Sequence, residues 1–216
     1  MKRSSTAAVF LILLMAAFVL QVDAFTGDHP WKKLSRPEKT WSAFHPFKAR
    51  KSYHCAIRAR AVTDSLEKAG TLTDKNGGQL DAFRHAYWMA LMINEGLSEK
   101  MARRIGKNHE KGNYLSYCRG ELEDSARTDS MACVMDLRNN DEGIRLGEGY
   151  RKGDRKLSLI QQVINQVWNG RLFILKKNAN GEYLDCEGKR IDLALYRQKW
   201  YVPKCIVGSD KVVPVH

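Results

Sequence analysis

The segment from residue 76 to residue 88 constrains the fold most, because it places polar and aromatic side chains together at helical spacing. An Asn-Gly-Gly turn opens it, and helix-forming and aromatic residues follow. In a helix, Asp81, His85 and Trp88 share one stripe, and Arg84 lies beside them. Such polar groups next to an indole need partners, either around a cleft or in a buried network. A polar network that only fixes helix packing is the structural alternative.

The first 24 residues have the pattern of a secretory signal peptide. Lys2 and Arg3 precede an uncharged apolar run over residues 7–20, and Val22-Asp23-Ala24 resembles a cleavage site before Phe25. The run is short for a membrane span, although an uncleaved anchor is the alternative. We therefore expect export, to the periplasm or to the outside of the cell.

The chain carries a net charge of +12, with 36 Lys and Arg residues against 24 Asp and Glu residues. This excess predicts an anionic partner, such as an envelope polymer, an anionic membrane surface or a nucleic acid. The basic residues are dispersed along the chain, so charge that only aids solubility is an equal alternative. The sequence makes no prediction of the oligomeric state.

Hydrophobic periodicity predicts a mainly α fold with a small C-terminal β-hairpin. Residues 25–46 contain prolines and tryptophans with little periodicity, and we expect them to form an extended arm. Residues 47–170 are expected to form the helical domain that carries the site, and residues 113–130 within it read as a polar loop or a short, weak helix. The expected helices span residues 48–69, 80–94, 99–111, 131–147 and 156–168.

A small β-containing tail is expected over residues 171–216. Residues 171–175 and 182–186 have strand-like composition, and the turn-forming residues 178–181 lie between them, so the two strands are expected to form a hairpin. Residues 193–202 fit a further strand or a short helix.

Five cysteines follow the signal peptide: Cys55, Cys118, Cys133, Cys186 and Cys205. Export permits disulfides, and an odd number leaves at least one thiol outside intramolecular pairing. Proximity in the sequence predicts the pairs 118–133 and 186–205, which leaves Cys55 free. No Cys-x-x-Cys motif is present, which argues against a structural zinc knuckle.

Two further predicted helices carry polar pairs. His109-Glu110 ends one helix, and Asp136 and Asn140 lie one turn apart on another. Neutral imidazoles and carboxylates are suitable ligands for zinc or manganese. If the three helices pack together, a divalent metal could be held by Asp81, His85, His109 and Asp136. Alternatively, Asp81 could cap its helix and His109 could interact with a helix dipole.

The three segments together resemble a known family. Their pattern, Asp-Ala-x-Arg-His from residue 81, His-Glu from residue 109 and Met-Asp-x-x-Asn-Asn from residue 135, is similar to that of an uncharacterised bacterial domain family of secreted and toxin-associated proteins. The resemblance covers about residues 76–175 and implies no established activity. More loosely, the order resembles helical metal-dependent phosphohydrolases of the His-Asp type, although this chain has Glu110 where they have Asp.

The first functional hypothesis is an exported, metal-dependent hydrolase of the toxin or effector kind, acting on an anionic envelope or phosphoester substrate. Its catalytic candidates are His85, His109 and Glu110, with Glu110 as the base. Its substrate-binding candidates are Arg84, Trp88 and Asn140.

Two other hypotheses need no metal. A cell-wall glycan hydrolase would use Glu110 or Asp81 as the proton donor and Asp136 as the second carboxylate. A non-catalytic binding or interaction module would use the same polar groups as a packing network.

Overall fold

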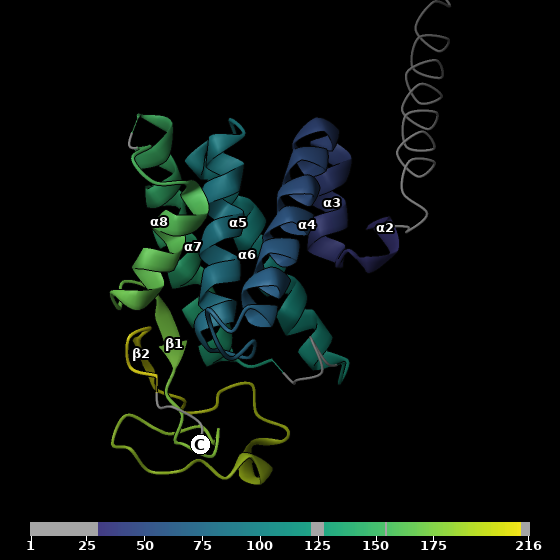
Figure 1. Ribbon diagram of the computed structural model, residues 1–216. Coiled ribbons are helices and arrows are strands. Elements are labelled where there is room, and N and C mark those ends of the chain that lie inside the picture. Colours follow the sequence, from purple (N-terminus) through teal and green to yellow (C-terminus); the bar gives the residue numbers. More distant parts are fainter. Residues whose placement is uncertain (1–29, 122–127, 154, 213–216) are drawn as a thin grey trace, which may run out of the picture.

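The computed structural model of the protein describes residues 30–121, 128–153 and 155–212 (Figure 1). The predicted signal peptide lies outside these residues. The expected mainly α fold with a small antiparallel sheet near the C-terminus is confirmed. The elements are α2 (Pro30–Lys33), α3 (Arg36–Phe44), α4 (Pro46–Lys68), α5 (Gln79–Asn94), α6 (Glu99–Cys118), α7 (Ser130–Arg151), α8 (Leu159–Trp168), β1 (Phe173–Leu175), the 3-10 helix η1 (Leu193–Tyr196) and β2 (Ile206–Gly208).

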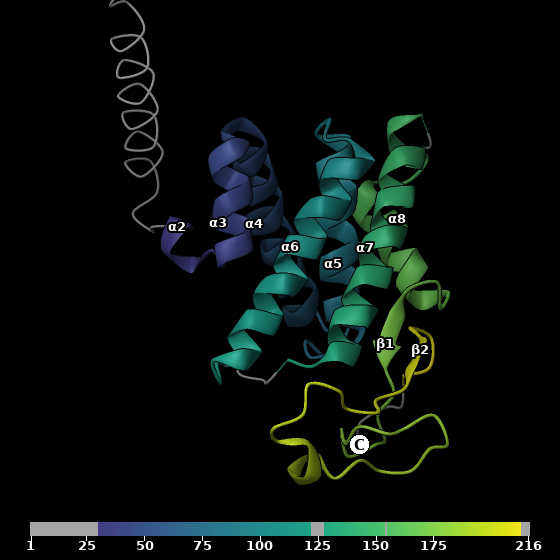
Figure 2. The same cartoon turned by 180° about the vertical axis from the view of Figure 1, so that it is seen from behind.

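Helix α5 is the centre of the bundle. Thirteen of its 16 residues are buried, on all sides of the helix. A helix that is apolar all round is one that other elements enclose, and α5 contacts α4, α6, α7, α8 and β1. Figures 1 and 2 show α3 and α4 on one side of it and α7 and α8 on the other. Among the described residues, no helix combines the length and apolarity that a membrane crossing requires.

Helix α7 packs closely against α5 because two glycines face the contact. Gly143 lies against the backbone of Ala86, and a Cβ at Gly147 would lie 2.8 Å from the carbonyl oxygen of Ala90. Asp136 and Asn140 precede these glycines at helical spacing on the same side of α7. The close crossing therefore carries their side chains to α5.

The N-terminal segment differs from the prediction. Residues 36–44 are helical, so the expected extended arm over residues 25–46 is wrong there. A capping box begins α3: the backbone N–H and the hydroxyl of Ser35 both donate to the Glu38 carboxylate. This local signal outweighs the weak hydrophobic periodicity. Residues 25–29 lie outside the described residues.

Helix α6 is longer than expected and continues to Cys118. The prediction ended it near Gly112, since glycine often follows a helix. Here Gly112 lies inside the helix, and a Cβ at this position would be 2.6 Å from the hydroxyl oxygen of Ser35. Gly112 is therefore a point of close approach between α6 and the start of α3.

The sheet also differs in its pairing. β1 pairs with β2, with Ile174 opposite Val207, so the predicted hairpin partner over residues 182–186 is wrong. Residues 177 and 183 form an isolated bridge around the predicted turn. Of the two alternatives expected for residues 193–202, a strand or a short helix, the structure has the short helix, a 3-10 helix over residues 193–196.

Only one of the two expected disulfides is present. Cys186 and Cys205 are bonded, as predicted, whereas Cys118, Cys133 and Cys55 are free thiols. The predicted 118–133 pair is wrong, because Cys118 is exposed at the end of α6 and Cys133 is buried beside Glu110.

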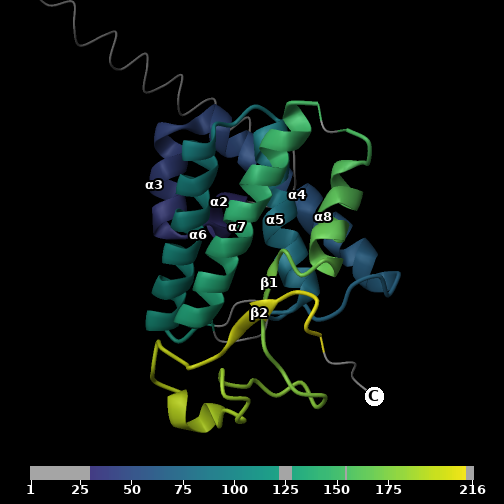
Figure 3. The same cartoon turned by 90° about the vertical axis from the view of Figure 1, so that its left-hand side faces the viewer.

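The tail lies beneath one end of the bundle (Figure 3). Lys177 donates to the carbonyl oxygen of Asn76 at 2.7 Å, so the tail contacts the loop before α5. Lys204 forms a buried ion pair of 2.6 Å with Asp129, the residue that caps α7. The backbone N–H of Ser130 donates to the carbonyl oxygen of Trp200. The tail thus covers the end of the bundle where α5 and α7 begin.

Candidate metal centre

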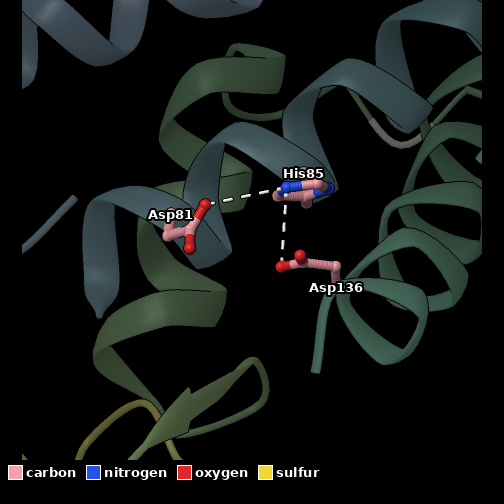
Figure 4. Close-up of side chains that lie close together, drawn as sticks. All are labelled: Asp81, His85 and Asp136. Carbon is pink, nitrogen blue, oxygen red and sulfur yellow. Dashed lines mark ion pairs between the residues drawn. The ribbon is translucent and has the colours of Figure 1, made fainter. Parts of the chain in front are cut away.

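Three buried side chains from two helices meet near the covered end of the bundle. Asp81 and His85 project from α5 and Asp136 from α7 (Figure 4). The Nε2 atom of His85 lies 3.6 Å from Asp81 Oδ1 and 3.5 Å from Asp136 Oδ1. One potential ligand atom from each residue lies within 4.8 Å of the other two. Ligand atoms that share a divalent ion at about 2.0–2.2 Å are separated by about 3–3.6 Å, so the two distances from His85 Nε2 suit one shared ion.

His85 is oriented for such a role. Its Nδ1 lies 3.4 Å from the amide oxygen Oδ1 of Asn140. An amide oxygen only accepts, so this contact favours the tautomer that carries the proton on Nδ1, and Nε2 faces the carboxylates. Burial, reinforced by the charges of Arg84 and His109, holds the pKa of His85 well below its usual value. The ring is therefore neutral in the absence of an ion.

This arrangement suits a divalent cation. A neutral His85 that is protonated on Nδ1 presents the lone pair of Nε2 to two carboxylate oxygens, and Nε2 has no hydrogen-bond partner among the described residues. His85 is 1% exposed, so water does not screen this repulsion. A divalent ion bound to all three groups would turn the repulsion into attraction.

Neighbouring groups fix the carboxylate of Asp81. Its Oδ2 accepts a hydrogen bond of 2.9 Å from the backbone N–H of Gly77, and its Oδ1 lies 2.6 Å from Arg84 Nη2. The glycine turn before α5 thus supports the site directly. The Arg84 side chain is 21% exposed, which places a guanidinium between the carboxylate and solvent.

Asn140 and Trp88, two of the three predicted substrate-binding residues, have structural partners. The Asn140 side chain lies against His85, and Gly106 of α6 makes room for it, because a Cβ there would be 2.8 Å from Asn140 Nδ2. The indole N–H of Trp88 donates to the carbonyl oxygen of Ser52 at 3.2 Å. Asn140 is 2% exposed and Trp88 is 9% exposed, so both lie inside the bundle rather than on its surface.

His109 lies beside the three-residue group and is not part of it. Its ring centroid is 6.0 Å from that of His85, and its edge packs against Trp88. Its Nδ1 lies 3.2 Å from Oε1 of Glu38, on α3. Burial raises the pKa of Glu38, but the hydrogen bond and charge of His109 and the hydrogen bonds from Ser35 outweigh this, and the net shift is downward. Glu38 and His109 thus form a second acid–imidazole pair.

Glu110 is buried and faces a different set of partners. Its Oε2 accepts a hydrogen bond of 3.1 Å from Asn113 Nδ2. The thiol of Cys133 lies beside it, and burial together with the charges of Glu110 and Asp136 raises the pKa of that thiol. Cys133 is therefore a protonated thiol near neutral pH.

Three neighbours of the site were not predicted from the sequence: Glu38, Asn113 and Cys133. A signal for Glu38 was present, since Ser35-Arg36-Pro37-Glu38 has the spacing of a capping box. That pattern predicts a helix start but not the contact with His109, 71 residues further along the chain. The positions of Asn113 and Cys133 follow from helix packing that no local pattern encodes.

Comparisons with known proteins give a family but no activity. No curated protein and no solved structure matches the chain. The family described as Domain of unknown function (DUF6973) matches residues 39–171, which include α4 to α8 and the part of α3 that follows Glu38. Since this match spans more than half of the chain, the protein belongs to that family of domains of unknown function.

Proposed function

We propose that this protein is an exported, metal-dependent hydrolase that acts on an anionic envelope or phosphoester substrate. The observation that carries the proposal is the buried group of Asp81, His85 and Asp136, in which the acceptor nitrogen of His85 faces two carboxylate oxygens. Zinc and manganese both accept such a nitrogen and oxygen donor set.

The ligand number supports a catalytic rather than a structural ion. Structural zinc sites use four protein ligands, whereas three ligands leave a position for water or substrate. Asp81 and Asp136 retain side-chain exposures of 11% and 9%, while His85 retains none. A small substrate group would therefore approach from the side of the carboxylates, where Arg84 also reaches solvent.

The chain's own residues have distinct roles in this proposal. A bound divalent ion would polarise a substrate oxygen and lower the pKa of a bound water. His109, held at Nδ1 by Glu38, would exchange a proton with the reacting groups, and Glu110 is the second proton-transfer candidate. Arg84 would contact the anionic group of the substrate.

The compartment and substrate class rest on the sequence. The net charge of +12 favours an anionic substrate, and the signal-peptide pattern favours a periplasmic or extracellular location. The resemblance of the motif pattern to secreted and toxin-associated bacterial proteins supports the same compartment.

Turnover measurements with and without metal test the proposal. The protein is stripped with a chelator and reloaded with zinc or manganese, and hydrolysis of bis(para-nitrophenyl) phosphate and of isolated cell-wall fragments is measured. We expect turnover to disappear on stripping and to return on reloading. His85→Gln should lower kcat/KM by at least about 100-fold, since loss of a direct ligand should exceed the loss seen for outer partners.

Asp141→Asn is the control. It changes a carboxylate on α7, the helix that carries Asp136, at a position that is 44% exposed and paired with Arg103. Its turnover should equal that of the wild type. Cell-wall lysis that persists in chelator would instead indicate a metal-independent glycan hydrolase, and a metal-loaded protein without turnover on either substrate would overturn the hydrolase assignment.

A further inference from the structure

The side of the bundle formed by α3 and α4 carries almost only positive charge. Residues 30–61 contain nine Lys and Arg residues and a single acidic residue, Glu38. Glu38 is engaged with Ser35 and His109, so its charge is directed to the site rather than to the surface. The next acids along the chain, Asp64 and Glu67, pair with Lys75 at the far end of α4. The exposed cations of this side are Lys32, Arg36, Lys48, Arg50, Lys51, Arg58 and Arg60.

The turn between α3 and α4 exposes two large apolar side chains. Phe44 is 78% exposed and Phe47 is 71% exposed, the two highest values for large apolar side chains among the described residues. They flank His45 and Pro46, where one helix ends and the next begins. Exposed aromatic side chains beside a row of cations are not explained by packing of the bundle.

We propose that this side of the protein, the α3–α4 surface, binds an anionic lipid bilayer. Lys and Arg side chains are attracted to anionic headgroups, and the two phenylalanines at the turn are placed to enter the boundary between headgroups and acyl chains. The proposal does not depend on the metal site, whose residues lie inside the bundle.

Nucleic acid shares the anionic charge and is the competing partner. The exposed groups at the turn favour the bilayer over a duplex, because Phe44 and Phe47 provide exposed apolar area and no hydrogen-bonding group that reads a base. A bilayer contact would need both the phenylalanines and the cations, whereas a phosphate backbone would need mainly the cations.

Co-sedimentation of the purified, exported protein with vesicles tests the proposal. Vesicles of phosphatidylcholine alone are compared with vesicles that also contain phosphatidylglycerol, and mass spectrometry establishes that all variants share one N-terminus. We expect binding to the anionic vesicles only, and weaker binding at high salt. Phe44→Ser with Phe47→Ser should weaken binding by roughly tenfold or more, and Lys48→Gln with Arg50→Gln by roughly 30-fold.

Matched pairs elsewhere serve as controls. Leu195→Ser with Tyr201→Ser removes side chains of 67% and 60% exposure from the tail, and Lys100→Gln with Arg104→Gln removes two exposed cations from α6. Both should leave vesicle binding unchanged. Equal losses in the control pairs, or no binding to anionic vesicles, would overturn the proposal. So would tighter binding to a DNA duplex that the phenylalanine substitutions do not affect, since this would assign the surface to nucleic acid.

Discussion

A series of glycine substitutions on α7 tests whether the close crossing of α5 and α7 builds the site. A Cβ at Gly147 would lie 2.8 Å from the carbonyl oxygen of Ala90 and from Cβ of Ile93, while ordinary contact begins at 3.4 Å. The helices would have to separate by about 0.6 Å, and such overpacking costs about 2 kcal/mol. Alanine recovers up to about 1 kcal/mol of helix propensity, so Gly147→Ala should destabilise the protein by about 1 kcal/mol.

Gly149 is the matched control, because a Cβ there meets nothing within 4 Å. Gly149→Ala should keep only the propensity gain and stabilise the protein by up to about 1 kcal/mol. Gly143, whose Cβ would overlap the backbone of Ala86, should cost at least about 3 kcal/mol when changed to alanine. In order of decreasing stability we therefore expect Gly149→Ala, the wild type, Gly147→Ala and Gly143→Ala.

Thermal and urea unfolding, followed by circular dichroism, measure the series. The midpoint should fall by about 2–4 °C for Gly147→Ala and rise by up to about that amount for Gly149→Ala. Equal effects at the two positions would refute the account of the helix crossing, because the steric difference between them is its only basis.

Three further predictions follow from other parts of the molecule. In the folded protein a thiol reagent should modify the exposed Cys118 and spare Cys133 and Cys55, because both are buried and burial raises the pKa of Cys55 to about 11. Mass spectrometry should find one adduct before denaturation and three after it, and a native 118–133 disulfide would contradict this. Lys204→Met should cost about 3–5 kcal/mol, because it leaves Asp129 buried without its ion-pair partner, whereas the exposed Lys199→Met should have little effect on the unfolding midpoint. Against the opposing effect of burial, the hydrogen bond and charge of His109 hold the pKa of Glu38 below its value in the unfolded chain. Its charge therefore contributes stability that is complete above the unfolded-state pKa and is lost as the pH falls through the folded-state pKa. The stability difference between wild type and Glu38→Gln should shrink in that acid range, and a constant difference would show that the charge has no such role.

The helical framework was predictable because it depends on local patterns. The buried α5, the stop after residue 94 and the helices before and after it follow from apolar spacing and from turn residues at their ends. The same spacing correctly placed Asp81 with His85 and Asp136 with Asn140 on shared helix faces. We expected the helices to bring these residues together, and in the structure Asp136 and Asn140 of α7 do lie beside Asp81 and His85 of α5.

The remaining features depend on contacts between distant parts of the chain. The pairing of β1 with β2 joins segments more than 30 residues apart, and no turn signal encodes it. Gly112 was interpreted as a helix end and the Ser35 capping box was not recognised, whereas in the structure both lie where α6 and α3 meet. Glu38 joined the site for the same reason, through a helix that the sequence analysis expected to be an extended arm.

The number of metal ions bound per chain tests the central claim most directly. Chelator-stripped wild type, Asp136→Asn and Asp141→Asn are titrated with zinc and with manganese, and isothermal calorimetry gives the stoichiometry and affinity of each. We predict one ion per chain for the wild type and for Asp141→Asn, and at least about 100-fold weaker binding for Asp136→Asn, which loses a direct ligand without a change in shape. Equal binding by all three proteins, or no binding by the wild type, would contradict the assignment of Asp81, His85 and Asp136 as a metal centre.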